Sequence, residues 1–314
     1  MLTPKQVNDY HEHGYGGPFP ALSMAEVSRF REELEAFEAS QGARLSVLPG
    51  QVRAKTHLLL PFMQELIRLK PVLDAVESLI GSNLLVYHLT CWLKEPGDGA
   101  FTSWHQDAAY FFLDPPEHVT AWIALSNATQ ESGCMRVIPG SHRRGAIEHG
   151  KGETKNNLLS NGQFVDSGET AQTQFLEVPA GHFSLHDTYL VHSSAPNKSS
   201  ERRIGIGVSY IPTRVRCTHG KQLSATLVRG EDEYRHFRPE PAPLGAYDAE
   251  AVVTHADATR NFFAQHGSER SGGAEPRDGH DGDHACRPAD LCADGAAGDP
   301  DLDRDHGPGV RRRP

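Results

Sequence analysis

The feature that most restricts the fold is a series of short apolar runs that begins at Leu84 and continues to Ile211. Each run has the length and residue types of a β-strand, and turn signals rich in Gly, Pro and Asp separate the runs. No helical pattern alternates with them, so a doubly wound parallel sheet fits poorly. The series predicts a double-stranded β-helix, the barrel of jelly-roll and cupin-like folds. The predicted strands are 84–93, 119–125, 134–138, 175–178, 183–185 and 204–211.

The segment before Leu84 carries helical patterns instead. Thr3 is an N-cap followed by proline, and Gly14 is a C-terminal stop. Ser23 with Glu26 matches a capping box that opens a second helix. A further helix is predicted over 72–80. We therefore expect a mainly β fold with α-helices from the N-terminal part packed against the outside of the barrel.

Composition divides the chain after residue 266. Residues 267–314 hold nine Gly, five Pro, 11 acidic residues, seven Arg and no aromatic residue. Such a segment buries too little apolar surface to offset the entropy of ordering it, so it is predicted to be a disordered tail. Its histidines and cysteines lack paired zinc-ligand spacing, which makes a metal site there the weaker interpretation. Residues 1–266 are expected to form one domain.

Charge and hydropathy argue against several classes of protein. The net charge is −10, whereas a general nucleic-acid binder needs a basic face. No apolar stretch is long enough to span a membrane, and the polar N-terminus does not match a signal peptide. The five cysteines are scattered, and Cys91 and Cys134 are expected to be small buried residues. We expect a cytoplasmic protein that acts without nucleic acid or a membrane.

The segment most informative about chemistry is Trp104-His105-Gln106-Asp107. If it lies on a strand, His105 and Asp107 point to the same face and can take neighbouring positions on one metal ion. A third ligand from a facing strand would complete the 2-His-1-carboxylate triad of non-haem Fe(II) enzymes, which leaves positions for a co-substrate and O2. In a chain with 18 His, such a pair on its own also arises by chance.

A second informative segment runs from His192 to Ile204. It offers a histidine at a strand end, a polar turn, and Arg203 at the start of the next strand, 11 residues after His192. A planar guanidinium suits bidentate capture of a carboxylate, so a buried arginine near a metal is expected to hold an anionic co-substrate. Arg202 should face the other way as a surface charge, and a strand phase shifted by one residue would exchange the two roles.

Three motifs occur in order, WHQD at 104–107, GCMRVIPGSH at 133–142 and HSSAPNKSSERR at 192–203. Together they resemble the phytanoyl-CoA dioxygenase family of Fe(II)- and 2-oxoglutarate-dependent oxygenases. The resemblance covers about residues 1–240. It includes GYGGPF at 14–19, a phrase also typical of related halogenases that act on carrier-bound amino acids.

The resemblance implies roles for particular residues. Arg203 would pair with the distal carboxylate of 2-oxoglutarate, Ser194 would help to hold the same carboxylate, and Trp122 would lie beside the co-substrate. Halogenases carry a small residue in place of Asp107, so the resemblance implies oxygenation rather than chlorination. The iron ligands, and hence the catalytic centre, would be His105, Asp107 and His192.

Two other histidines are candidates for metal binding. His186 and Asp187 form a rival metal pair, but adjacent strand residues point to opposite faces, which favours a hydrogen-bonded structural role. His142 follows Pro139-Gly140-Ser141, and a structural turn is the favoured interpretation.

The sequence does not decide the role of several basic and aromatic residues. Arg136 is a candidate contact for a substrate anion. Arg53 and Lys55 either contact an acidic substrate or are simply solvated. The aromatic residues at 110–112 belong either to the core or to the substrate pocket.

The sequence therefore predicts an oxygenase that uses Fe(II), 2-oxoglutarate and O2 to oxidise an unactivated C–H bond of a small molecule. The outcome would be hydroxylation, desaturation or oxidative cyclisation, with succinate and CO2 as co-products. The halogenase-like phrase favours a natural-product or antibiotic intermediate as substrate. Two alternatives are a cupin-like barrel with another metal and no 2-oxoglutarate, and a non-catalytic binding protein. A complete ligand set with Arg203 argues against both.

Overall fold

The computed structural model describes residues 1–265 except 153–154, 160–162, 167–171 and 220–222. The predicted tail, with His280, His284, Cys286, Cys292 and His306, lies outside the described residues. No helix in the described part is long and apolar enough to cross a membrane. The helices are α1 (Pro4–His13), α2 (Met24–Gln41), α3 (Pro61–Leu66), α4 (Lys70–Ile80), α5 (Ala108–Phe111) and α6 (Ala249–Ala264), with 3-10 turns η1 (Gly50–Arg53), η2 (Thr56–Leu58) and η3 (Ser141–Arg144).

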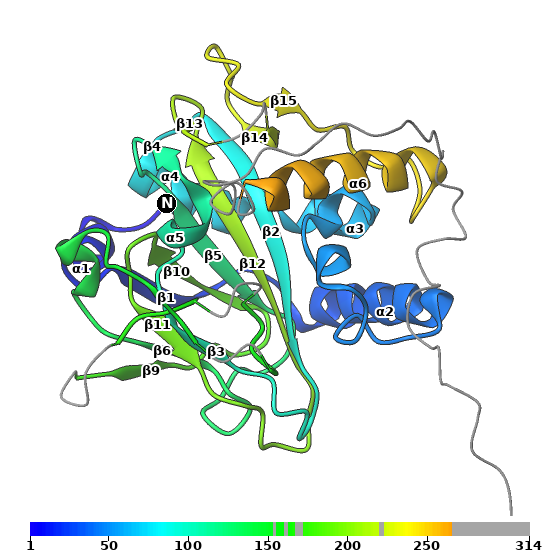
Figure 1. Ribbon diagram of the computed structural model, residues 1–314, viewed down its shortest axis with the longest axis horizontal. Helices are drawn as coiled ribbons and strands as arrows, with labels where there is room; N and C mark the ends of the chain where they lie inside the picture. Colours follow the sequence, from blue (N-terminus) through cyan, green and yellow to red (C-terminus); the bar gives the residue numbers. More distant parts are fainter. Residues whose placement is uncertain (153–154, 160–162, 167–171, 220–222, 266–314) are drawn as a thin grey trace, which may run out of the picture. The chain divides into compact units, whose positions relative to one another are not determined.

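Two sheets form the barrel (Figure 1). The larger has the order β1-β10-β5-β12-β2-β14-β15, and every pair in it except β14 with β15 is antiparallel. Its strands are β1 (Tyr15–Pro20), β10 (His182–Asp187), β5 (Val119–Ala124), β12 (Arg203–Pro212), β2 (Leu84–Lys94), β14 (Ser224–Arg229) and β15 (Arg238–Pro239). The smaller has the order β3 (Thr102–His105), β11 (His192–Ser194), β6 (Met135–Val137) and β9 (Gln174–Leu176).

Short two-stranded sheets complete the description. One pairs β13 (Arg216–Cys217) with β4 (Leu113–Asp114), and the other pairs β7 (Gly150–Lys151) with β8 (Gln163–Phe164). The expected antiparallel barrel with helices outside it is confirmed, and each of the six predicted strands corresponds to an observed one. β1, β14 and the C-terminal helix α6 were not predicted.

The N-terminal helices begin and end where the sequence indicates. Thr3 and Ser23 each form a capping box, with Gln6 and Glu26 respectively, and Gly14 ends α1 in the left-handed conformation. α4 covers the predicted range 72–80 and begins two residues earlier. These local signals involve residues close in sequence, which is why they could be recognised without the fold.

The faces of the larger sheet have different neighbours. On β2, Leu89, Cys91 and Leu93 belong to a core that includes residues of α2, α3 and α4. Figure 1 shows α2, α3 and α6 on the side of β2 away from the smaller sheet. The alternate residues of β2, among them His88, Thr90 and Trp92, line the interior of the barrel instead. Cys91 and Cys134 are buried free thiols, as expected.

Candidate active site

Strand pairing brings the two predicted histidine ligands together. β3 and β11 are antiparallel neighbours, and His105 and His192 are directly opposite each other in their register. The imidazole centroids lie 4.1 Å apart. Both side chains are buried, so the pairing places two nitrogen ligands inside the barrel.

Backbone hydrogen bonds fix the orientation of both imidazoles. Nδ1 of His105 donates to the Ser103 carbonyl at 2.8 Å, and Nδ1 of His192 donates to the Leu190 carbonyl at 2.9 Å. With the proton on Nδ1, each Nε2 carries a free lone pair. The Nε2 atoms lie 3.6 Å and 3.8 Å from Oδ1 of Asp107, and this arrangement is suited to a metal ion.

Asp107 does not lie on the strand, and here the sequence-based expectation was wrong. β3 ends at His105, and Asp107 has αR backbone angles at the start of α5. The buried side chain of Gln106 causes the turn, because its amide donates to the Gly145 and Tyr189 carbonyls. The carboxylate nevertheless reaches both histidines, and the ligand atoms of the three residues all lie within 4.8 Å of one another.

The second carboxylate oxygen of Asp107 is held by two side chains of the larger sheet. The Thr120 hydroxyl donates to Oδ2 at 2.7 Å, and His186 Nε2 donates to the same atom at 3.2 Å. His118 Nε2 in turn lies 3.1 Å from the Thr120 hydroxyl. His186 thus has the expected hydrogen-bonded role, while Asp187 accepts a bond from the Tyr189 amide. Such supporting bonds orient a ligating carboxylate.

Protonation of the cluster also fits a metal. Burial alone would raise the pKa of Asp107, but His105, His186 and His192 hold it well below its usual value. Burial, with His105 and His186 nearby, lowers the pKa of His192 well below its usual value. An ionised carboxylate and a neutral imidazole are the forms that bind metal ions. The residues present therefore fit a divalent cation.

Two buried basic side chains lie at or beside one end of the interior cavity. Arg203, on β12, donates to the Gly133 carbonyl, and its Nε has no hydrogen-bond partner. Lys94, opposite it on β2, donates to Ser194 Oγ at 2.7 Å and to the Ala195 carbonyl. Neither forms an ion pair with an acidic residue of the described ranges. Burial and the charge of Arg203 lower the pKa of Lys94 to about 6. Unneutralised positive charge of this kind favours an anionic ligand.

The other residues predicted for the co-substrate line the same end. Ser194 also contacts Thr102 Oγ1 at 2.6 Å, and the Trp122 ring centroid lies 5.5 Å from the Arg203 guanidinium carbon. Arg203, Ser194 and Trp122 share this cavity with the His-Asp-His cluster. The structure therefore brings all six predicted site residues to one place.

A larger cavity of about 450 Å³ continues on the other side of the cluster. Both cavities are lined by the same central residues, which include His105, Asp107, Thr90 and Trp92. The walls of the larger cavity include Tyr110 and Phe111, and also Phe262 and Phe263 of α6. Tyr110 and Phe111 therefore line a pocket. Its volume is in the range of small-molecule sites.

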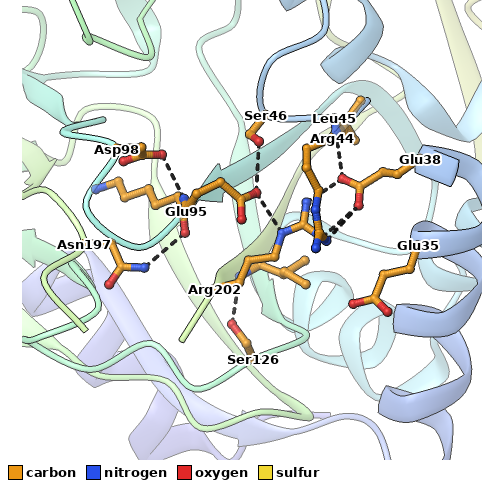
Figure 2. Close-up of polar contacts among 12 residues, drawn as sticks. Glu35, Glu38, Arg44, Leu45, Ser46, Glu95, Asp98, Ser126, Asn197 and Arg202 are labelled. Atoms are coloured by element: carbon orange, nitrogen blue, oxygen red, sulfur yellow. Dashed lines mark hydrogen bonds and ion pairs between the residues drawn. The ribbon is translucent and has the colours of Figure 1, made fainter. Parts of the chain in front are cut away.

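Arg202 is not the surface charge that the sequence predicted. It does face away from the cavity, but its side chain is only 8% exposed. Figure 2 shows Arg202 between two acids: it forms an ion pair with Glu38 of α2, and its Nε donates to Glu95 at 2.8 Å. Sequence alternation gave its direction but not the acids that arrive from distant segments.

Three further candidates occupy other places. Lys55 is buried and paired with Glu240 at 2.5 Å, so it is neither solvated nor in the cavity. Arg136 is exposed and stacks over Trp104 and Phe175 outside the cavity that holds the cluster. His142 lies in the turn η3, as expected, and bonds to the His11 carbonyl.

Sequence reasoning missed the supporting residues Thr120, His118 and Lys94. It also missed Gly205 and Gly207 on β12, where a Cβ would overlap the rings of Trp122 and Trp92 respectively. A signal for the glycines was present, because isolated glycines inside a strand mark a close approach. The polar residues gave no local signal, since their partners lie on other strands.

Comparison with known proteins agrees with this geometry. The profile of the phytanoyl-CoA dioxygenase (PhyH) family matches residues 10–205. A methylphosphonate hydroxylase of Gimesia maris is 28% identical over 220 residues, which cover 67% of this chain and 80% of that relative. The L-proline trans-4-hydroxylase of Streptomyces griseoviridis is 26% identical over 216 residues, or 62% of this chain and 81% of the relative.

Solved structures give the same result. The non-haem monooxygenase ThoJ superimposes with a TM-score of 0.73 and 28% identity, covering 84% of this chain and 98% of ThoJ. The 2-oxoglutarate-dependent carbocyclase SnoK from nogalamycin biosynthesis has a TM-score of 0.56 and 26% identity, covering 78% and 94%. The chain therefore belongs to the phytanoyl-CoA dioxygenase family of Fe(II)- and 2-oxoglutarate-dependent oxygenases.

Proposed function

We propose that this protein oxidises an unactivated C–H bond of a small molecule, with His105, Asp107 and His192 as the iron ligands. The observation that carries the proposal is the convergence of two oriented Nε2 atoms on an ionised carboxylate inside a closed barrel. Bound iron with 2-oxoglutarate and O2 supplies the oxidising power, and succinate and CO2 are the co-products. The protein orients the substrate and excludes water.

The cationic end of the cavity supports 2-oxoglutarate as the co-substrate. Arg203 would bind the distal carboxylate, Ser194 would accept or donate a further hydrogen bond to it, and Trp122 would form the wall beside it. A barrel that used another metal without 2-oxoglutarate would have no need for a buried arginine and a buried lysine that lack an acidic partner among the described residues. The same pair argues against a binding protein for neutral ligands.

Asp107 supports oxygenation over chlorination. Its carboxylate occupies the position next to both histidines and is held there by Thr120 and His186. A halide has no room at a position that a fixed carboxylate already fills. We further propose a natural-product intermediate as substrate, on the likeness to SnoK and the size of the cavity.

The test is an anaerobic titration with Fe(II) followed by 2-oxoglutarate, monitored by the weak visible charge-transfer band of the chelate. We expect a band that needs both components. In chloride-free buffer Asp107→Ala should lose it, because no halide can take the vacated position, and Asp187→Asn, the acid of the rival pair, should keep it. A band in Asp107→Ala equal to that of the wild type would refute the ligand assignment. Iron binding without any band would favour the barrel that does not use 2-oxoglutarate.

A further inference from the structure

One arginine that lines the larger cavity has no acidic partner among the described residues. Arg53 ends η1 and lines the larger cavity together with His105 and Asp107. Its Nε is buried without a hydrogen-bond partner, and its guanidinium forms no ion pair within the described ranges. Arg53 is half-buried, and burying its Nε–H without a partner is costly, so a ligand that supplies negative charge would relieve that cost.

The backbone around Arg53 is held firmly. Ala54 bridges to Thr90 of β2, and its carbonyl accepts a 2.8 Å bond from His255 of α6. The Lys55 amide donates to the Leu89 carbonyl at 2.7 Å. Three neighbouring contacts thus fix the direction in which the arginine leaves the chain. Pre-organisation of this kind reduces the entropy cost of binding a ligand.

The neighbouring basic residue shows what a structural role looks like here. Lys55 is buried in an ion pair with Glu240, which also contacts His57 and accepts a bond from Thr226. Its charge is therefore neutralised within the protein. Arg53 has no equivalent acid, although the two residues are only two positions apart. The contrast separates a cation that stabilises the fold from one that is available to a ligand.

The position of Arg53 relative to the iron site matches a substrate anchor. Arg203 lines the smaller cavity and not the larger one, Arg53 lines the larger and not the smaller, and the cluster residues His105 and Asp107 line both. The walls of the larger cavity include the aromatic residues Tyr110, Phe111 and Phe262. A ligand that fits both features has an anionic group at one end and an apolar body that reaches toward the metal.

We propose that Arg53 binds an anionic oxygen group of the substrate, a carboxylate or a phosphonate, and thereby presents an apolar part of the molecule to the iron. The substrate of this oxygenase is then a small acid rather than a neutral molecule. This inference rests on the proposed function, because it assigns the substrate class of the same site. Arg53 acts on the substrate and has no part in binding 2-oxoglutarate.

The test uses the full chain loaded anaerobically with Fe(II) and saturating 2-oxoglutarate. Binding of phenylacetic, phenylpropanoic and benzylphosphonic acids is measured by calorimetry. Each carboxylic acid is paired with its methyl ester, and the phosphonic acid is paired with its dimethyl ester, so that every ester is neutral. The variants are Arg53→Gln and Arg53→Lys, with Arg136→Gln as the matched control, since Arg136 is an arginine outside this cavity. The charge-transfer band is recorded for every variant as a separate measure of iron and 2-oxoglutarate binding.

We expect the wild type to bind acids at least about tenfold more tightly than their esters, because a charge-assisted hydrogen bond is lost in the ester. Arg53→Gln should remove that preference while keeping the band, Arg53→Lys should retain part of it, and Arg136→Gln should retain all of it.

Several outcomes would overturn the inference. The inference is wrong if no acid of the panel binds, or if acids and esters bind equally well to the wild type. It is also wrong if Arg53→Gln keeps the preference for acids over esters, or if Arg136→Gln loses that preference instead. A raised 2-oxoglutarate requirement in Arg53→Gln would assign the arginine to the co-substrate. Absence of the band in the wild type would overturn the proposed function and this inference with it.

Discussion

Arg202 and Arg203 are adjacent in sequence and lie in opposite environments. Arg202 bonds to Glu38 and Glu95 on the outside of the larger sheet, as Figure 2 shows, whereas Arg203 points into the cavity with no acidic partner. Burial alone would raise the pKa of Glu38, but the bonds from Arg202 and the Leu45 amide hold it below its usual value. The two arginines therefore provide a matched pair in which stability and co-substrate binding can be separated.

We expect Arg202→Gln to lower the free energy of unfolding by about 2 kcal/mol, because the buried Glu38 carboxylate loses its charge-assisted bonds to Arg202 and keeps only those to Arg44 and the Leu45 amide. The requirement for 2-oxoglutarate should not change. Arg203→Gln should raise that requirement by at least about tenfold, because it removes a charge-assisted bond to the carboxylate. Urea denaturation and 2-oxoglutarate titration of both variants check this. Exchanged effects would mean that the two roles are the reverse of those assigned.

Lys94 predicts a pH dependence of co-substrate binding. Burial and the charge of Arg203 lower its pKa to about 6, so the amine is neutral above that pH in the free protein. A bound carboxylate favours the charged amine and raises its pKa, so binding takes up a proton. The affinity for 2-oxoglutarate should therefore be greatest below about pH 6 and fall as the pH rises toward the pKa of the bound state. The carboxyl groups of 2-oxoglutarate are already ionised throughout this window.

The control for this prediction is Lys94→Met, which keeps an unbranched side chain but cannot titrate. Its affinity for 2-oxoglutarate should be weaker at low pH and nearly independent of pH above about 6. Calorimetry in buffers with different ionisation enthalpies measures the proton uptake directly. An identical pH slope in the variant and the wild type would show that another group is responsible.

Among the elements, β12 does most to shape the cavity. Its residues Ile204, Ile206 and Val208 pack into the helix-facing core, while Gly205 and Gly207 face the interior. The missing side chains leave room for two indoles from neighbouring strands, Trp122 of β5 and Trp92 of β2. One strand thus contributes both to the core and to the shape of the site.

Gly205→Ala and Gly207→Ala should each cost about 1–3 kcal/mol of stability, because a methyl group overpacks a filled space. Only Gly205→Ala displaces Trp122, which lines the co-substrate end with Arg203. We therefore expect a several-fold rise in the 2-oxoglutarate requirement for that variant and a smaller change for Gly207→Ala. Titration of the charge-transfer band compares the two. A larger effect from Gly207→Ala would contradict the assignment of Trp122.

The elements were predicted correctly where the interacting residues are close together in the sequence. The N-cap at Thr3, the capping box at Ser23 and the strand patterns of β2 and β12 are local signals, and they were recognised correctly. Asp107 was placed on a strand in error, because the turn depends on bonds from Gln106 to residues far along the chain. α6 lines the cavity and was missed, although Asp248 is an N-cap of the same local kind that was recognised at Thr3 and Ser23.

At the scale of the whole molecule, the site belongs to both sheets. The smaller sheet supplies His105 and His192, and the larger one supplies Thr120, Trp122 and Arg203. Neither sheet holds a complete site, and the apolar residues between the sheets, including Ala124 and Val137, keep them in register. Ligands that bind this site therefore stabilise the packing of the sheets against each other, so binding should be visible in global unfolding.

We expect Mn(II), as a redox-inert substitute for Fe(II), to raise the melting temperature of the protein when 2-oxoglutarate is present. At a hundredfold excess over Kd, linkage contributes about 2.7 kcal/mol, which for a chain of this size is roughly 4–5 °C. A chelator should reverse the shift. In chloride-free buffer Asp107→Ala should lose it, because the two histidines alone hold the metal weakly, while Asp187→Asn should keep it. Differential scanning calorimetry makes the comparison. If the rise in melting temperature persists in Asp107→Ala, the metal binds elsewhere. If Mn(II) alone gives the same rise as Mn(II) with 2-oxoglutarate, the co-substrate does not bind at the proposed end of the cavity.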